Sequence, residues 1–241
     1  MKDAEKVDTF DKDASVLRVS LFSDLRITEI GFEFEKQVYA EGFRFIAGVD
    51  EVGRGCLAGP VVAAACILDL DKPFPKGLDD SKKLTTETRE EIAAQLKDVC
   101  IAYAIAQVEA DEVDRINILE ATKVAMLNAI DKLKPAADFL LIDALKLKRS
   151  TLPQMAIIKG DCVSASIAAA SILAKTFRDD LMKAYDIDYP QYGFASHKGY
   201  GAPIHWEALR QHGPCPLHRL SFRGVCNNDD EKVLFAGMSV D

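Results

Sequence analysis

The chain has 241 residues, of which 49% are hydrophobic and 28% are charged, and its formal net charge is -8. This balance is typical of a globular protein, and the length allows one large domain. Every apolar run is much shorter than the ~20 residues of a membrane span, so we expect no membrane contact, and the polar N-terminus is unlike a secretory signal. The six cysteines lack zinc-like spacing, so we expect reduced thiols in a cytoplasmic protein.

The predicted elements alternate between helices and strands. Residues 1–32 are mostly polar and are expected to form an N-terminal extension, followed by one domain over 33–224 and a tail over 225–241. Periodicity and turn residues predict, in chain order, a helix over 33–43, strands over 45–50 and 61–68, a helix over 85–99, a strand over 101–108, a helix over 119–133, a strand over 139–142 and a helix over 163–183. This alternation favours an α/β layered fold.

The most informative segment runs from Ile46 to Leu68. Asp50 and Glu51 stand at the end of its first apolar run, and the sequence Gly53-Arg54-Gly55 follows them. Carboxylate oxygens are ligands that Mg²⁺ and Mn²⁺ prefer, and an arginine between glycines that expose backbone N–H groups suits a phosphate. A pair of adjacent acids is also common on a solvated strand edge, and that structural alternative stays open for this pair alone.

Two further acids lie at the ends of predicted elements. Asp143 ends a buried strand, where an unpaired charge would be costly, although it could also emerge into a loop. Asp161 stands just before the helix over 163–183, where capping of that helix is the structural alternative. The basic segment between the two acids could return the chain so that both face one point.

Several motifs, in one order along the chain, resemble those of the ribonuclease HII family, the type 2 ribonucleases H of bacteria. They cover roughly residues 40–224, and an ordered set is far more specific than any single motif. Besides the segment Ile46 to Leu68, they are Asp80-Ser81-Lys82-Lys83-Leu84, Ile116-Asn117-Ile118-Leu119, Leu140-Leu141-Ile142-Asp143, Ile158-Lys159-Gly160-Asp161 with the helix after it, His197-Lys198-Gly199-Tyr200-Gly201 and His218-Arg219-Leu220-Ser221-Phe222.

The resemblance implies a ribonuclease H-like mixed β-sheet flanked by helices, with a more helical C-terminal part, and makes 33–224 the catalytic domain. It implies that the catalytic and metal-binding carboxylates are Asp50, Glu51, Asp143 and Asp161, which together would hold two Mg²⁺ or Mn²⁺ ions. Such a cluster of like charges is poorly explained as structure, because each acid would raise the pKa of the others unless cations intervened. The implied activity is hydrolysis of the RNA strand of RNA–DNA hybrids and incision at ribonucleotides embedded in duplex DNA, leaving 5′-phosphate and 3′-hydroxyl ends.

The resemblance also implies the residues that bind the substrate. In the family, the loop that matches Gly53-Arg54-Gly55 contacts the ribose 2′-hydroxyl, and the tyrosine that matches Tyr200 stacks beside the sugar. A structural alternative for Tyr200 is simple packing of its ring, and for Ser81 a turn or helix cap. The full set of candidates is Gly53, Arg54, Gly55, Ser81, Lys82, Lys83, Lys198 and Tyr200, with His197, His218 and Arg219 as weaker phosphate contacts.

Other features bear on partners and on rival functions. The charge of -8 argues against a protein that coats DNA, so we expect a substrate held locally by basic groups within the motifs. Leu234-Phe235 in the acidic tail resembles short motifs that dock on sliding clamps, and packing on the domain is the alternative. We expect a monomer.

The rival functions are a binding module without catalysis, which would lack an acid, and a phosphatase of small substrates, which would not need Tyr200.

Two positions depart from the family pattern. Cys56 stands where a small residue or proline is more frequent, and Ala144 follows Asp143 where glycine is common. Neither change removes an acid or the Gly53-Arg54-Gly55 loop, so we expect the activity to be intact. The short extension and that loop favour this family over ribonuclease HIII.

Overall fold

The computed structural model describes residues 29–79, 81 and 84–226. Their centre is a five-stranded sheet in the order β3-β2-β1-β4-β5. The strands are β1 Ile46–Val52, β2 Val61–Ile67, β3 Ala102–Val108, β4 Phe139–Asp143 and β5 Gln154–Ile157. β1 pairs antiparallel with β2 and parallel with β4, which confirms the predicted mixed sheet.

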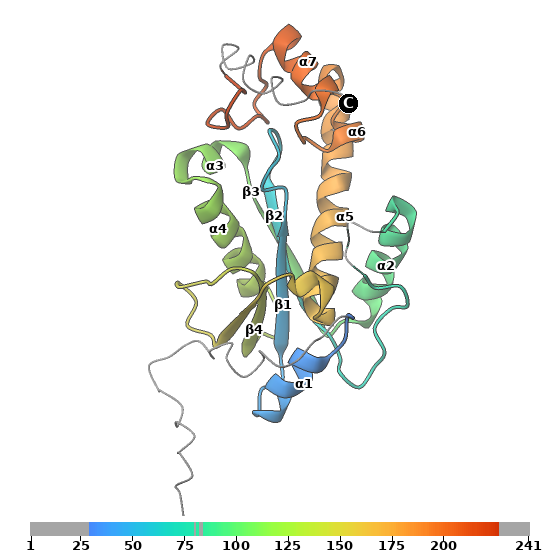
Figure 1. The fold of residues 1–241 in the computed structure, drawn as a ribbon. Helices are drawn as coiled ribbons and strands as arrows, with labels where there is room; N and C mark the ends of the chain where they lie inside the picture. The colour runs from blue at the N-terminus through green and yellow to red at the C-terminus, as the bar shows by residue number, and fades with distance from the viewer. Residues whose placement is uncertain (1–28, 80, 82–83, 227–241) are drawn as a thin grey trace, which may run out of the picture.

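Helices cover both faces of this sheet (Figure 1). They are α1 Glu33–Ala40, α2 Thr86–Val99, α3 Ala110–Ile116, α4 Ile118–Asp131, α5 Ala165–Asp188, α6 Phe194–His197 and α7 Pro203–His212, with 3-10 turns η2 Gly160–Cys162 and η3 Pro190–Tyr192. In Figure 1, α4 lies on one side of β1 and β2, α5 lies on the other, and α2 lies outside α5. None of the helices in the described ranges is long and apolar enough to cross a membrane.

β2 shows why the core has two halves. All its residues are buried, as a strand with helices on both faces requires. Alternate side chains point to opposite faces, so Val61, Ala63 and Ala65 pack in the cluster that contains α4. Val62 and Ala64 instead join the cluster that contains α5 and α2.

The small residues of α5 and β1 let this helix lie directly on the sheet. A Cβ atom added at Gly48 of β1 would stand 2.0 Å from the backbone carbon of Ser166 in α5. Alanines 168, 169 and 170 of the helix are fully buried in the same contact. The helix therefore approaches β1 closely, and its next turns pass the C-terminal end of that strand.

Every helix and strand predicted from periodicity is present, with boundaries that differ by a few residues. The start of α2 is capped by Thr85, whose hydroxyl accepts a hydrogen bond from the Thr88 N–H. α6 and α7 lie in the C-terminal part, which was expected to be helical without specific ranges, and α3 and β5 were missed. α3 is a short helix of mostly charged residues, and β5 is a four-residue edge strand, so neither carries a long apolar period.

The C-terminal part is helical, as expected, and packs on the segment after β1. Leu57 and Ala58 lie in one apolar cluster with Met182, Tyr192 and Phe194. The Leu57 N–H donates to the Gly199 carbonyl at 2.8 Å, and Figure 1 shows α6 and α7 beyond the end of β1. This packing brings the segment 197–201 to the edge of the sheet where β1 ends.

Two predicted boundaries concern the ends of the domain. Phe32, in the predicted extension, is buried with its ring centroid 5.2 Å from that of Phe74, so the packed part begins before residue 33. Val225, in the predicted tail, is also buried. Residues 1–28 and the clamp-like Leu234-Phe235 lie outside the described residues.

Candidate active site

The parallel register of β1 and β4 brings two of the predicted acids together. Val49 pairs with Ile142, so Asp50 and Asp143 follow at the same edge of the sheet. They open into a cavity of about 240 Å³. Its lining comes from β1, the loop after it, the end of β4, α5 and the C-terminal segment, and consists of Asp50, Glu51, Val52, Gly53, Arg54, Gly55, Ser81, Asp143, Ser171, Lys175 and Tyr200.

The carboxylates of this cavity carry the electrostatic signature of a cation site. Burial, and then the neighbouring charges of Glu51 and Asp143, raise the pKa of Asp50 well above its usual value. Burial also raises the pKa of Glu51, while its hydrogen bond with Arg54 lowers it. The Oε2 atom of Glu51 is buried, and no atom of the described residues forms a hydrogen bond with it. Like charges held together out of water, with one orphaned oxygen, fit a site that a divalent cation completes.

Asp161 lies beside this group without lining the cavity. It is 5% exposed and sits in η2, where the N–H of the preceding Gly160 donates to the Oδ1 atom of Asp143 at 2.7 Å. The capping alternative for Asp161 is wrong, because the cap of α5 is Ser164, whose Oγ accepts from the Ile167 N–H. The structure thus brings the fourth acid next to the third through the turn that contains Gly160.

The acids fit hard cations by their chemistry, although they do not yet converge on one point. Among the residues that the structure describes, no three side chains of His, Cys, Asp or Glu already form a metal-holding group. Mg²⁺ usually keeps several waters and takes one or two carboxylates together with substrate phosphate oxygens. Asp50, Glu51 and Asp143 around one cavity, with Asp161 adjacent, are a donor set of that type.

The Gly53-Arg54-Gly55 loop forms one wall of the cavity. Gly53 has a φ of +90°, and a Cβ atom there would stand 2.3 Å from the Nε of Arg178, so only glycine fits. The Arg54 Nη1 atom lies 3.0 Å from the Oε1 of Glu51, and its half-exposed side chain remains at the rim. A Cβ atom at Gly55 would meet nothing within 4 Å, so this residue faces open space.

Tyr200 and Lys175 also line the cavity. The Tyr200 side chain is 42% exposed, and the Nζ of Lys175 lies 5.9 Å from its ring centroid. Lys175 is held in place by Asp179, whose Oδ1 atom lies 2.6 Å from its Nζ and whose Oδ2 pairs with the buried Arg89 at 3.0 Å. The Lys175 ammonium group is therefore fixed at the edge of the acidic cavity.

Lys175 was not singled out as a site residue from the sequence. The signal was present in its spacing, because Ser171 and Lys175 are four residues apart and face the same side of a helix. Ser171 also hydrogen-bonds Asp50, and its Oγ lies 3.0 Å from that of Ser81. Ser81, one of the predicted substrate residues, is thus buried and linked to an acid of the cavity through Ser171.

The other predicted contacts divide into three cases. Lys82 and Lys83 lie outside the described residues. The Lys198 ammonium donates to the Ala195 carbonyl, is not part of the cavity lining, and has its pKa lowered by burial. Phosphate contact by His218 and Arg219 was a wrong prediction, because these side chains are 2% and 0% exposed and bond to protein atoms.

His197 is half-buried, and its ring nitrogens bond to backbone atoms. Its Nε2 lies 2.8 Å from the Tyr192 carbonyl oxygen, and its Nδ1 accepts from the Gly199 N–H at 3.2 Å. The structure therefore gives His197 a local role in shaping the segment before Tyr200.

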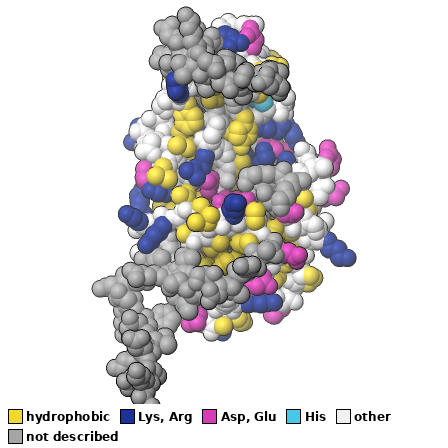
Figure 2. All heavy atoms as spheres, viewed as in Figure 1, with side chains coloured by type: hydrophobic (Ala, Val, Ile, Leu, Met, Phe, Trp, Pro, Cys, Tyr) yellow, Lys and Arg dark blue, Asp and Glu magenta, His cyan; other side chains and the backbone are white. Residues whose placement is uncertain are grey.

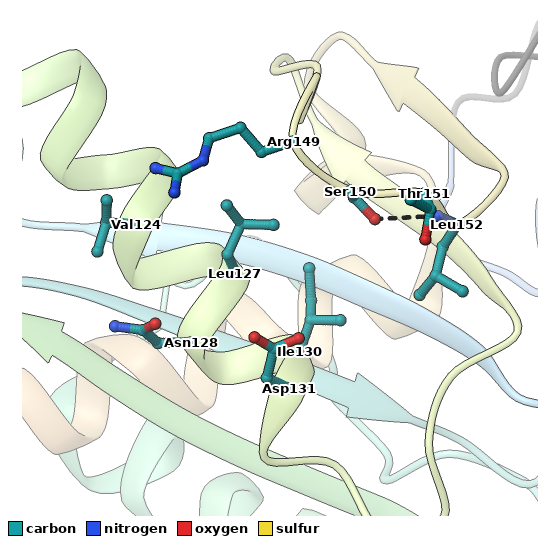
Figure 3. Close-up of a pocket in the computed structure, with 9 residues that line it drawn as sticks. All are labelled: Val124, Leu127, Asn128, Ile130, Asp131, Arg149, Ser150, Thr151 and Leu152. Carbon is teal, nitrogen blue, oxygen red and sulfur yellow. Dashed lines mark hydrogen bonds between the residues drawn. The ribbon is translucent and has the colours of Figure 1, made fainter.

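A larger cavity of about 390 Å³ lies elsewhere, between α4 and the segment that returns the chain to β5 (Figure 3). Figure 3 shows Arg149 reaching toward α4, with Asp131 on that helix below it. The Leu152 N–H donates a hydrogen bond to the Ser150 hydroxyl. None of the four predicted acids lines this cavity.

The surface in Figure 2 has acidic and basic side chains interspersed, with no single sign dominating the face it shows.

Comparison with known proteins gives one consistent answer. A sequence model of the family Ribonuclease HII matches residues 47–225. Ribonuclease HII of Chlamydia caviae is 57% identical over 193 residues, which are 80% of this chain and 90% of that protein. Ribonuclease HII of Ruminiclostridium cellulolyticum is 52% identical over 189 residues, 78% of this chain and 74% of that protein.

Solved structures agree. The ribonuclease H2 from Pyrococcus horikoshii superposes with a TM-score of 0.64 at 26% identity, over 76% of this chain and 95% of that one. The PCNA:RNase HII complex from Archaeoglobus fulgidus gives a TM-score of 0.62 at 25% identity, over 81% of this chain and 98% of that one. The mixed sheet flanked by helices is thus the architecture of ribonuclease H endonucleases. The chain belongs to the ribonuclease HII family, hydrolases that cleave RNA in RNA–DNA hybrids.

Proposed function

We propose that this chain is a metal-dependent endonuclease that acts on the RNA strand of hybrids and also incises at single ribonucleotides in duplex DNA. The observation that carries the proposal is the cavity in which Asp50, Glu51 and Asp143 meet, where burial and mutual repulsion raise the pKa of Asp50. Together with Asp161, these acids would hold two Mg²⁺ or Mn²⁺ ions, which supply an activated water and stabilise the leaving oxygen.

The residues of the chain would then hold the substrate around this centre. Gly55 presents open backbone at the cavity wall, and Tyr200 offers a half-exposed ring in the same cavity. A 2′-hydroxyl is what distinguishes RNA from DNA at a given site, so contacts from this backbone and this ring would supply the selectivity. Phosphate contacts are assigned to Arg54 and, by resemblance, to Lys82, Lys83 and Lys198, with Ser81 supporting the wall.

Lys175 places a fixed positive charge in the proposed substrate site. Its ammonium lines the cavity and is oriented by the buried Asp179. A phosphate of the substrate backbone that passes Tyr200 would meet this charge, and the interaction would be strengthened by the partial exclusion of water. The same position would help to offset the negative charge of the acids before any substrate binds.

The deciding experiment is cleavage of an end-labelled DNA duplex that carries one ribonucleotide, with Mg²⁺, with Mn²⁺ and with a chelator. We expect incision at the ribonucleotide with either ion, products with 5′-phosphate ends, and no cleavage with the chelator. An all-DNA duplex and a small phosphate monoester serve as controls, and both should remain intact. Binding without incision under every metal condition would show a binding module, and turnover of the monoester would show a phosphatase.

Partners beyond the nucleic acid are a separate part of the proposal. The relative from Archaeoglobus fulgidus was solved as a PCNA:RNase HII complex, and Leu234-Phe235 of this chain would provide a similar weak contact with a sliding clamp. Deletion of residues 227–241 should then leave cleavage intact and abolish binding to the clamp. We further propose a monomer that works in the cytoplasm, a compartment in which the free thiols would stay reduced.

A further inference from the structure

Arg219 is a fully buried arginine whose partners are backbone carbonyls. Its Nε and Nη2 atoms both donate to the Gly59 carbonyl, at 3.1 and 2.8 Å, and its Nη1 donates to the Arg54 carbonyl at 3.0 Å. The side chain is 0% exposed, and within the described residues no carboxylate forms an ion pair with it. A buried, charged side chain thus holds two peptide groups of one loop in place.

Burying the charged Arg219 side chain costs free energy of folding, which is expected only where the position of the loop matters. Burial lowers the pKa of Arg219 to about 10, so the guanidinium is still charged at neutral pH. Charged donors make hydrogen bonds about twice as strong as neutral ones, and the planar fork of arginine fixes their directions. The backbone of residue 219 is itself anchored, because its N–H donates to the Leu57 carbonyl at 2.8 Å.

The Arg54 carbonyl determines the direction of the next N–H. Arg54 and Gly55 are joined by a trans peptide, in which the carbonyl and the N–H point in opposite directions. With the carbonyl held inward by Arg219, the Gly55 N–H is turned away from the core. Gly55 is exposed, lines the acidic cavity and has open space around it. Among the described residues, no backbone carbonyl accepts from this N–H.

We propose that Arg219 is a positioning residue for recognition of ribose: it holds the Arg54 carbonyl in the core and so aims the Gly55 N–H at the ribose 2′-hydroxyl. The inference rests on the proposed function of the Gly53-Arg54-Gly55 loop and adds the residue that orients it. Arg219 touches neither substrate nor metal. Its loss therefore reduces the preference for a ribonucleotide and leaves the metal requirement unchanged.

The test compares Arg219→Lys and Arg219→Gln with the parent. Affinity is measured by fluorescence anisotropy in a chelator, for a duplex with one ribonucleotide and for the all-DNA duplex of the same sequence. Loss of one directed hydrogen bond predicts a fall in the ratio of the two affinities of about three- to tenfold for Arg219→Gln. Lysine keeps the charge and one donor, so Arg219→Lys should recover part of the preference. The Mg²⁺ concentration for half-maximal cleavage should not move.

Asp114→Ala is the matched control. Asp114 accepts hydrogen bonds from the N–H groups of Leu220 and Ser221, so this variant loosens the same segment without touching Arg54. We expect it to lower the melting temperature and to keep the parental preference. An equal loss of preference in Asp114→Ala, or full preference in folded Arg219→Gln, would overturn the inference. A parent that shows no preference for the ribonucleotide would instead contradict the proposed function.

The parent protein allows a test even where an Arg219 variant fails to fold. With ¹⁵N-glycine labelling, the amide resonance of Gly55 should shift more with the ribonucleotide duplex than with the all-DNA duplex. An N–H that enters a hydrogen bond to oxygen moves its proton resonance downfield, while a loop that faces away gives equal shifts. Equal shifts would show that the Gly55 N–H does not point at the 2′-hydroxyl, and would contradict the proposed role of Arg219.

Discussion

The Gly160 N–H donates to the Oδ1 atom of Asp143 at 2.7 Å, and this bond joins the end of β4 to the turn that carries Asp161. Asp143 ends a strand and Asp161 sits in a 3-10 turn. Ala144, directly after Asp143, has a φ of +50°, a left-handed conformation that glycine adopts more easily than alanine. The backbone at this corner is thus shaped to present one acid and to hold another beside it.

Replacing Asp143 by Asn should reduce cleavage by roughly a hundredfold or more, the scale on which a stabiliser of transition-state charge is lost. Asn keeps the oxygen that accepts from Gly160, so the corner should stay intact. Without metal, the melting temperature should be no lower than that of the parent, because removal of one charge relieves repulsion on Asp50. A large fall in the melting temperature would indicate a structural role for the carboxylate.

Tyr200→Ala should reduce cleavage at a single ribonucleotide by about one to two factors of ten, since a stacking contact is worth ~1–3 kcal/mol. The effect should appear in KM or affinity for the duplex. The ring lines the same cavity as the Gly53-Arg54-Gly55 loop. A Mg²⁺ titration of both proteins is the check. A shifted metal requirement with an unchanged affinity would show that the ring supports the acids.

Gly48→Ala should prevent folding or lower stability by several kcal/mol, because its methyl group would stand 2.0 Å from the backbone of Ser166. The helix cannot move away from the strand without opening the core between β1 and α5. Gly55→Ala is the matched control, with nothing within 4 Å of the added atom, and should melt like the parent. Thermal melting of both variants measures the difference, and a Gly48→Ala protein as stable as the parent would contradict the close packing.

The buried histidines predict a loss of stability in acid. Burial lowers the pKa of His205 and of His218 to about 4, and their Nε2 atoms lie 3.0 Å apart. The unfolded chain binds protons on these rings from about pH 6.5 downward, while the folded chain does so only near pH 4. Their contribution to stability is therefore complete above pH 6.5 and is lost as the pH falls toward 4.

A comparison of variants isolates this contribution. His218→Asn keeps an acceptor for the Cys215 N–H, which donates to the Nδ1 of His218 at 2.9 Å, but does not titrate. Between pH 7 and 4, its melting temperature should fall less than that of the parent. Parallel curves for the two proteins would show that other groups cause the acid sensitivity.

Strong apolar patterns and the order of the motifs made most of the elements predictable from the amino acids alone. The continuous apolar run over 139–142 predicted the buried strand β4, and periodicity predicted the helix over 163–183 that corresponds to α5. The acids Asp50, Glu51 and Asp143 were identified by motif order and do line one cavity. Local patterns carry this information because they reflect which side of an element faces the core.

Which basic residues face the cavity could not be predicted and became clear from the folded chain. Arg219 was expected at a phosphate and is buried, with a partner, Arg54, that is 165 positions away in the chain. Lys175 was one basic residue among many until α5 was placed beside β1 and Asp179 was seen to hold its ammonium. Charged side chains have similar local patterns whether they bind a phosphate, a carbonyl or water. Their role is set by long-range packing, which determines the partners that remain once water has been excluded.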